Sequence, residues 1–246
     1  MINLRCHKEG EPLKIVGDRL HDGHDFFVSS SAKGSVFDYL IFLDSRGIGR
    51  QFKGSLGHRL ITRISQLDKT YIIVCRPLDL TIWASLIGFL ANNKFEVAKI
   101  ITNMGFVDFT PKKYSILQDV TKQVASNVKK GVTKTYFVED YVSETETIPL
   151  YAIRYGDAYQ CAVQDIADNY NMLIINTPLT DPRIRVDRKR PASFFAAQEH
   201  SNAFNKSIAG VQLIDLPNFD ESFTYDAVHY TDVGNELIFN RVEEYL

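Results

Sequence analysis

Runs of apolar residues alternate with amphipathic stretches over most of the chain. The first continuous apolar run, residues 35–43, predicts a buried strand. Residues 55–67 then carry apolar side chains at spacings of three and four, which is typical of one face of a helix. Strand and helix signals repeat in this way about five times along the chain. The other predicted strands are 71–75, 97–102, 172–175 and 211–216, and the other predicted helices are 80–92, 114–128, 159–170, 194–208 and a final one from about 231.

This alternation predicts an α/β fold with a mostly parallel central sheet. Each crossover between parallel strands lays a helix over the sheet, so helices are expected on both faces, giving a three-layer α/β/α sandwich. One domain covering residues 35–246 accounts for the whole pattern.

Two segments depart from the alternation. Residues 1–34 are interpreted as an N-terminal extension in which Leu13–Val16 and Phe26–Ser29 flank an Asp-Gly turn and form a hairpin. Residues 133–156 mix aromatic and polar side chains, which suits an irregular or hairpin insertion in the domain.

The charge of the chain narrows the classes of function. Among 246 residues, 28 are Lys or Arg and 30 are Asp or Glu, giving a formal net charge of −2. Such a chain has no general positive field to attract nucleic acid or an anionic membrane surface, so neither is expected as a partner. The N-terminus lacks the apolar core of a secretory signal, and the longest apolar stretch, residues 80–91, is interrupted by polar residues and glycine. We therefore expect a cytoplasmic protein; its oligomeric state is left open.

Metal and cofactor sites are not predicted. Cys6, Cys75 and Cys161 are too far apart for a zinc knuckle and are interpreted as reduced thiols. The histidines and aspartates of residues 21–25 are interpreted as a solvated turn. Neither G-x-x-x-x-G-K-[ST] nor G-x-G-x-x-G occurs, which disfavours a nucleotide-binding protein.

Polar residues follow the first and third predicted strands, where ligands of open parallel sheets bind. Asp44 and Ser45 end the first strand, and a serine on such a strand-to-helix turn is a candidate nucleophile. Asn103 follows the third strand, and its side-chain amide is a candidate donor to an oxyanion.

An aspartate and a histidine, Asp226 and His229, precede the last predicted helix, for which Thr231 is the candidate N-cap. A serine hydroxyl needs a base within hydrogen-bond reach, and a histidine base needs an acceptor that fixes its tautomer. Asp226 and His229 are the candidates for these two roles.

Together, these blocks resemble those of the SGNH, or GDSL-type, hydrolase family. The most specific block is DAVHYTDVGNELI near the C-terminus, and the resemblance covers about residues 35–246. It implies a flavodoxin-like fold and the activity of an esterase, lipase or carbohydrate deacetylase. It also implies Ser45 as nucleophile, Asn103 as oxyanion donor, and Asp226 with His229 as the pair that activates the serine.

Two positions depart from the family pattern. Leu43 stands where the family has the glycine of Gly-Asp-Ser, and Pro77 lies where a glycine amide completes the oxyanion hole. The leading prediction is a serine esterase that removes an acyl group, with acetyl as the leading candidate, from a carbohydrate or related ester. The alternatives are an O-acyltransferase of the same fold and an inactive module that binds a glycan or a protein.

Arginines near the predicted strand ends raise the question of an anionic substrate. Arg46 and Arg76 are candidate substrate-binding residues on a positive rim, and residues 181–190 contain five basic side chains. A solvated loop is the favoured interpretation of residues 181–190.

Overall fold

The computed structural model describes residues 2–4, 15–17, 26–29, 35–48, 53–75, 81–93, 95–143, 145–185 and 190–246. Their strands are β1 (Ile2–Leu4), β2 (Ile15–Gly17), β3 (Phe26–Val28), β4 (Val36–Leu43), β5 (Tyr71–Cys75), β6 (Glu96–Thr102), β7 (Val132–Val142), β8 (Thr147–Tyr155), β9 (Met172–Ile175) and β10 (Gln212–Ile214). Their helices are α1 (Ser45–Ile48), α2 (Leu56–Gln66), α3 (Trp83–Asn92), α4 (Phe106–Phe109), α5 (Tyr114–Asn127), α6 (Asp157–Asn169), α7 (Ala192–Lys206) and α8 (Asp232–Glu243).

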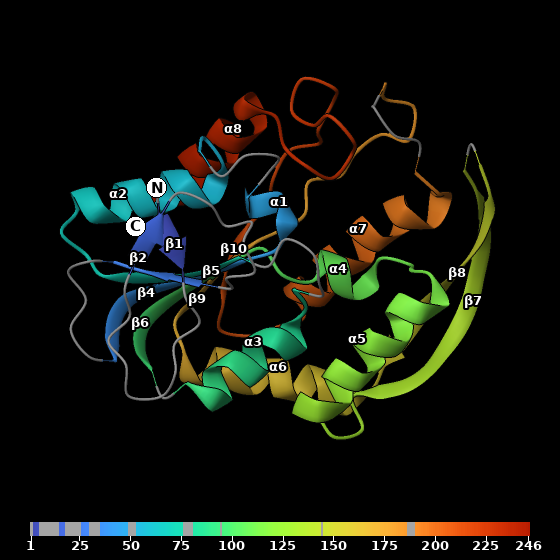
Figure 1. Ribbon diagram of the computed structural model, residues 1–246, viewed down its shortest axis with the longest axis horizontal. Coiled ribbons are helices and arrows are strands. Elements are labelled where there is room, and N and C mark those ends of the chain that lie inside the picture. Colours follow the sequence, from blue (N-terminus) through green and yellow to red (C-terminus); the bar gives the residue numbers. More distant parts are fainter. Residues whose placement is uncertain are drawn as a thin grey trace.

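The central sheet has the order β10-β9-β6-β4-β5-β3 (Figure 1). Every neighbouring pair is parallel except β3 and β5, which are antiparallel. Counted along the parallel strands in chain order, the spatial order is 2-1-3-4-5, which is that of flavodoxin-like folds. The prediction of an α/β fold with a mostly parallel sheet is confirmed.

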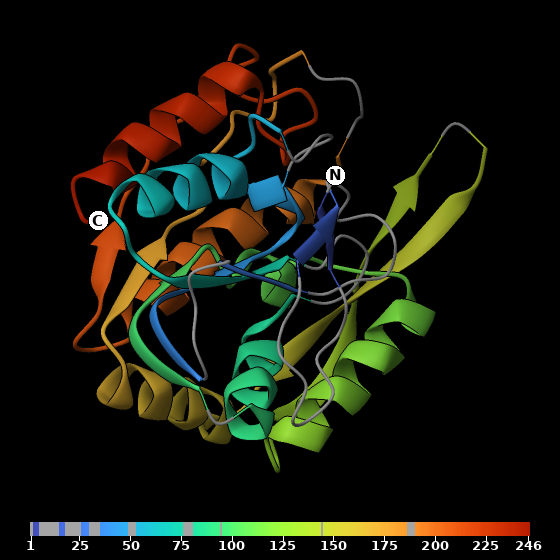
Figure 2. The same ribbon diagram turned by 60° about the vertical axis from the view of Figure 1, so that its left-hand side comes forward.

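The sheet is covered on both faces, as Figures 1 and 2 show. Helices α2 and α8 cover one face, and α3, α5 and α6 cover the other. Strand β4 shows why, because its successive side chains point to opposite faces. Leu40 and Phe42 pack against the α3 side, while Ile41 and Leu43 pack against the α2 side, all nearly inaccessible to water. Burial on both faces explains the continuous apolar run of this strand.

The N-terminal hairpin prediction is wrong in its pairing. Strand β2 pairs antiparallel with β1, and β3 joins the central sheet beside β5. Short apolar runs such as Phe26–Val28 do not specify their partner, which here is supplied by the tertiary fold.

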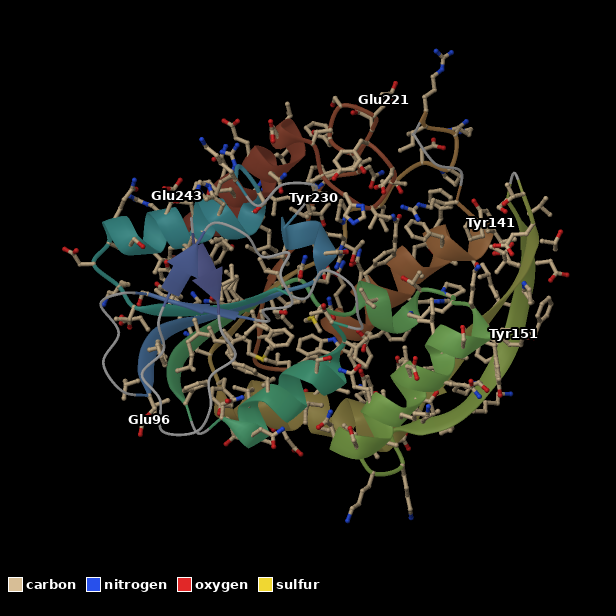
Figure 3. All side chains as sticks on the ribbon, in the orientation of Figure 1. Glu96, Tyr141, Tyr151, Glu221, Tyr230 and Glu243 are labelled. Atoms are coloured by element: carbon tan, nitrogen blue, oxygen red, sulfur yellow. The ribbon has the colours of Figure 1, made fainter. Side chains whose placement is uncertain are left out.

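The segment predicted as irregular or hairpin forms a hairpin, β7–β8, outside the central sheet. It curves along the outside of the molecule (Figures 1 and 2), and Tyr141 and Tyr151 mark its two strands in Figure 3. Within the described part of the chain, no helix has the length and apolar character needed to cross a membrane.

A buried carboxyl, Asp108, lies beneath α3. Its Oδ1 accepts hydrogen bonds from the backbone N–H of Trp83, at 3.2 Å, and from the Tyr159 hydroxyl. Its Oδ2 has no partner among the described residues. Burial raises the pKa of Asp108 to about 7, against the weaker opposing effect of these hydrogen bonds.

Replacing Asp108 with Asn should therefore flatten the dependence of stability on pH. Because its pKa is raised in the folded state, the folded protein binds more protons than the unfolded one between about pH 4 and 7, and stability falls as pH rises through this range. Between about pH 5 and 8, the free energy of unfolding should decrease by about 1–3 kcal/mol less in the variant than in the wild type. Urea unfolding at the two pH values measures this difference. Asp119→Asn, an exposed change on α5, is the control. An unchanged pH dependence in Asp108→Asn would contradict the prediction.

Candidate active site

The candidate site lies where the strand order of the sheet reverses. Strands β4 and β6 are neighbours there, and ligands of doubly wound sheets bind outside the carboxyl ends of such strands. Ser45 is the first residue of α1 and is separated from the end of β4 by Asp44 alone, and Asn103 directly follows β6. The fold thus brings two of the predicted residues to the same edge of the sheet.

Asn103 is joined to Asp44 by two hydrogen bonds. Its Oδ1 accepts from the backbone N–H of Asp44 at 2.8 Å, and its Nδ2 donates to Asp44 Oδ1 at 2.9 Å. Asn103 is only 1% exposed. In this arrangement the amide fixes the turn that carries Ser45, and its role as oxyanion donor stays a prediction.

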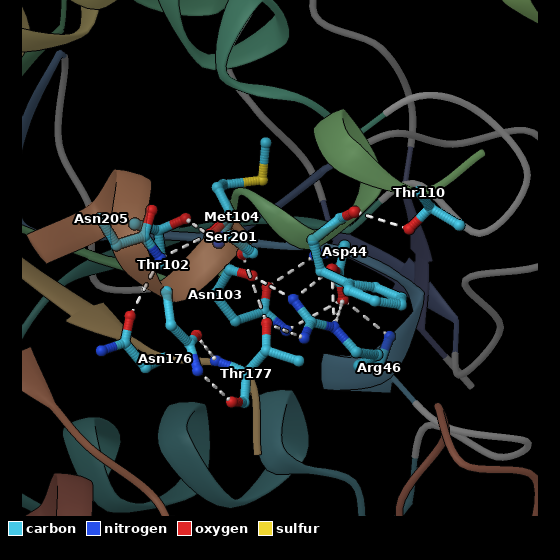
Figure 4. A network of polar contacts seen from close by, with 12 residues as sticks. Asp44, Arg46, Thr102, Asn103, Met104, Thr110, Asn176, Thr177, Ser201 and Asn205 are labelled. Carbon is cyan, nitrogen blue, oxygen red and sulfur yellow. Dashed lines mark hydrogen bonds and ion pairs between the residues drawn. The ribbon is translucent and has the colours of Figure 1, made fainter. Parts of the chain in front are cut away.

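Arg46 forms the centre of a buried polar network (Figure 4). Its guanidinium pairs with the Asp44 carboxylate at 2.7 Å, donates to Thr177 Oγ1 at 2.7 Å and donates to the Asn103 carbonyl. Burial lowers the pKa of Arg46, but the charges and hydrogen bonds of Asp44 and Tyr230 together outweigh this effect and raise it. The network connects the carboxyl ends of β4, β6 and β9.

The buried position of the Arg46 side chain differs from its predicted place on a positive rim that faces the substrate. The Arg46 side chain is 2% exposed and its donors are used inside the protein, so it supports the turn beneath Ser45 instead of facing a substrate. The second predicted rim residue, Arg76, lies outside the described residues, as does Pro77.

The turn at Ser45 forms without the glycine that the family pattern places before the aspartate. The Asp44 carboxylate accepts the backbone N–H of Arg46 at 2.9 Å, and the Asp44 carbonyl accepts that of Gly47 at 3.0 Å. A glycine is required at position 47 instead, since a Cβ there would lie 2.7 Å from the side chain of Leu43. Ser45 itself is half-buried.

Asp226 and His229 form a hydrogen-bonded pair. His229 Nδ1 lies 2.8 Å from Asp226 Oδ2, while Asp226 Oδ1 accepts the backbone N–H groups of Val228 and His229 at 3.0 and 2.7 Å. A carboxylate at Nδ1 favours the tautomer with the proton on that nitrogen, which leaves Nε2 as the acceptor. The arrangement is that of a histidine base held by an aspartate.

Several groups keep Asp226 ionised. Burial raises the pKa of this carboxyl, but the hydrogen bonds from His229 and the charge of Arg190 outweigh burial and hold the pKa at about 2. The carboxylate is therefore charged at every pH at which an esterase would be assayed.

Arg190 is a member of the site that the sequence analysis missed. Its Nη2 donates to Asp226 Oδ2 at 2.9 Å, and its Nε donates to the Asp226 carbonyl at 3.0 Å. The guanidinium carbon lies 4.9 Å from the centre of the Phe194 ring. Nothing in the sequence marks this contact, because the two residues are 36 positions apart and Arg190 stands in a run of basic residues.

The loop of His229 is anchored at the start of α8. Thr231 caps the helix as predicted, with its Oγ1 accepting the backbone N–H of Gly234 at 3.1 Å. A Cβ at Gly234 would lie 2.2 Å from the carbonyl oxygen of Phe223, so only glycine allows this close approach. The threonine and glycine of the C-terminal block thus have structural roles that hold the loop in place.

The two halves of the site meet through Arg46 and Tyr230. These residues directly follow Ser45 and His229 in the chain, and their buried side chains line the same small cavity, close enough for each to shift the pKa of the other. Figure 3 shows Tyr230 near α1. No hydrogen bond joins Ser45 to His229 in the described part of the chain, although such bonds are often long or absent before substrate binds.

No protein-family model and no curated protein matches the sequence. Solved structures with a similar arrangement include the acetyl xylan esterase AlAXEase, at 15% identity and a TM-score of 0.48, covering 85% of this chain and 98% of that one. The native aryl esterase of M. smegmatis shows 12% identity, a TM-score of 0.46, and coverage of 86% and 98%. A carbohydrate acetylesterase family member from Sinorhizobium meliloti shows 14% identity, a TM-score of 0.44, and coverage of 86% and 97%.

Proposed function

We propose that this protein is a serine esterase of the SGNH type that removes an acyl group, such as acetyl, from a carbohydrate or related ester. The observation that carries the proposal is the hydrogen-bonded pair of Asp226 and His229, on a loop whose Tyr230 lies close to Arg46 of the Ser45 turn. The substrate class comes from the resemblance of the sequence blocks to this family.

The proposed mechanism assigns each residue one task. Ser45 Oγ attacks the ester carbonyl while His229 Nε2 accepts its proton, and the tetrahedral oxyanion collapses to an acyl-enzyme as His229 returns the proton to the leaving alcohol. Water, activated by His229, then attacks the acyl-enzyme and releases the carboxylic acid. Asp226 orients the imidazole and stabilises its charged form.

Two donors are proposed for the oxyanion, the backbone N–H of Ser45 and the second N–H of the Asn103 amide. Asn103 Nδ2 gives one hydrogen to Asp44 Oδ1, which leaves the other for the substrate. Because Asn103 is nearly buried, this role requires substrate to approach the Ser45 turn closely.

Labelling by a fluorophosphonate probe tests the proposal directly. A serine next to a working base reacts with the probe, whereas an ordinary serine does not. We expect the probe to modify the peptide that contains Ser45, as seen by mass spectrometry, and to leave Ser45→Ala unmodified. Ser126→Ala, an exposed change on α5, is the matched control and should be labelled like the wild type.

The same experiment separates the proposal from the binding-module alternative. A module that only binds a glycan or protein has no reason to activate Ser45, so absence of labelling together with no hydrolysis of p-nitrophenyl acetate would favour it. Labelling with slow hydrolysis that increases when an acceptor sugar is added would identify an acyltransferase, in which the sugar replaces water in the second step.

A further inference from the structure

The hairpin β7–β8 contacts α7, the helix that lies against the loop of Asp226. The Oε1 of Glu139 on β7 accepts the backbone N–H of Ser193, the second residue of α7, at 2.8 Å. Figure 1 shows the start of α7 next to the hairpin. The hydrogen bond joins residues 54 positions apart, so it ties the inserted hairpin to the main domain.

Glu139 acts as the helix cap of α7. The N-cap residue is Pro191, whose ring has no hydrogen-bond acceptor. The first N–H groups of a helix need acceptors from outside the helix, and an oxygen on the N–H of the second helical residue is a usual capping contact. A carboxylate in this place also interacts favourably with the helix dipole. Glu139 supplies this acceptor from a distant part of the chain.

A β-bulge of the hairpin lies at the same place. Phe137 lies opposite Tyr151, and the register then shifts so that Glu139 lies opposite Leu150. An extra residue in one strand of an antiparallel pair changes the direction of the side chains that follow it. Glu139 is half-buried, whereas the next residue, Asp140, is exposed. The irregularity of β7 therefore coincides with its contact to α7.

The start of α7 in turn holds Asp226. Arg190 directly precedes the N-cap, and its guanidinium donates to both the carboxylate and the carbonyl of Asp226. One planar group that binds the side chain and the backbone of the same residue fixes the direction of the carboxylate. The ring of Phe194, in the first turn of α7, lies 4.9 Å from the same guanidinium. The position of Arg190 therefore depends on the first turn of α7.

The backbone next to Asp226 needs this support. Ala227 has a φ of 61°, a left-handed conformation that is unfavourable for a residue with a Cβ. Such a conformation persists where the surrounding contacts determine it. Helix α7 supplies several of them, because Gln198 donates to the Ala227 carbonyl at 3.3 Å, and Phe194 and Ala197 belong to the same buried cluster as Ala227. Helix α7 thus holds the loop of the proposed base in a strained conformation.

We propose that Glu139 is a positioning residue of the active site, which acts on His229 through α7, Arg190 and Asp226. The effect on catalysis rests on the proposed function. With the cap in place, the first turn of α7 keeps the guanidinium on Asp226, and Asp226 keeps the imidazole of His229 in its orientation. The hairpin then supports the catalytic base of the enzyme.

A double-mutant cycle tests whether Glu139 acts through Arg190. We expect Glu139→Ala to lower the second-order rate constant for fluorophosphonate labelling of Ser45 about fivefold, the factor that corresponds to the loss of a helix cap. In an Arg190→Met background, which has no guanidinium to position, the same change should lower the rate constant by less than about twofold. A general loss of stability would instead lower it equally in both backgrounds.

Two variants serve as matched controls for Glu139→Ala. Glu139→Gln keeps an acceptor oxygen for the N–H of Ser193, so its rate constant should stay within about twofold of the wild type. Asp140→Ala removes the neighbouring, exposed carboxylate of the same strand and should be labelled like the wild type.

A second measurement does not depend on activity. The ring proton on Nδ1 of His229 gives its own NMR signal when the hydrogen bond to Asp226 protects it from exchange with water. With isotopically labelled histidine, and assigned by its absence in His229→Ala, this signal should be sharp in the wild type and in Asp140→Ala. It should be broadened or lost in Arg190→Met and in Glu139→Ala.

The outcomes separate this proposal from the proposed function. Labelling of Glu139→Ala at the wild-type rate, or an equal loss in both backgrounds, would overturn the positioning role and leave the esterase in place. A wild type that is not labelled at all would overturn the proposed function. In that case the His229 signal decides alone: its loss in Glu139→Ala supports the positioning role, and an unchanged signal overturns it.

Discussion

Replacing His229 with alanine should lower kcat for ester hydrolysis about 10⁴-fold or more, the range found when members of such a triad are removed. In the proposed mechanism the imidazole accepts the proton of Ser45, so the variant lacks the base. The side chain is 27% exposed and its ring stacks on Tyr225. Asp226 keeps Arg190 as a partner in the variant, so stability should change little. Initial rates with p-nitrophenyl acetate and urea unfolding measure the two effects separately.

Two further variants sharpen this prediction. Asp226→Asn should also lower kcat strongly, because an amide at this position no longer fixes the tautomer of His229 or stabilises its charge. His200→Ala, an exposed histidine on α7, should retain wild-type activity. Equal activity of His229→Ala and the wild type, with both folded, would rule out the proposed base.

Replacing Arg46 with methionine should destabilise the protein by about 3–5 kcal/mol, the cost of leaving one partner of a buried ion pair without the other. The variant leaves the Asp44 carboxylate charged and 1% exposed, with Thr177 and the Asn103 carbonyl also losing a donor. Urea unfolding and thermal melting should report the loss, which corresponds to a fall in Tm on the order of 10 °C for a chain of this length.

A surface ion pair provides the control for Arg46. Arg63 on α2 contacts Glu243 on α8 at 2.8 Å, with both side chains more than a third exposed, so Arg63→Met should cost less than about 1 kcal/mol. Adding Asp44→Asn to Arg46→Met should recover part of the stability, because the unpaired buried charge is removed. If Arg46→Met and Arg63→Met lowered the free energy of unfolding by the same small amount, the buried network would not stabilise the turn.

The positions of strands and helices could be predicted from the sequence because burial imposes a period on each of them. Strand β4 is a continuous apolar run because both of its faces are covered. Helix α2 has apolar residues at sequence spacings of three and four because only one of its faces is covered. Pairing between short strands could not be predicted in this way. The partner of β3 is a strand more than forty residues later in the chain, and no local pattern identifies it.

The candidate site was predictable where its residues are close in sequence. Asp226 and His229 are three residues apart, so one loop can join them. Arg190 and Arg46 illustrate the opposite case. The sequence shows that both are basic, but whether an arginine faces solvent or a buried carboxylate depends on the tertiary surroundings of that carboxylate.

The buried network around Arg46 also has a consequence for how the chain folds. Arg46 and Thr177 are 131 residues apart, so the guanidinium is enclosed only when strands from both halves of the chain have assembled. A fragment that ends before β9 would expose this charge pair to water or leave it incompletely bonded. Contacts of such long sequence separation slow folding and make it cooperative. Unfolding should therefore be a single transition, with backbone amides at the ends of β4, β6 and β9 exchanging their hydrogens together.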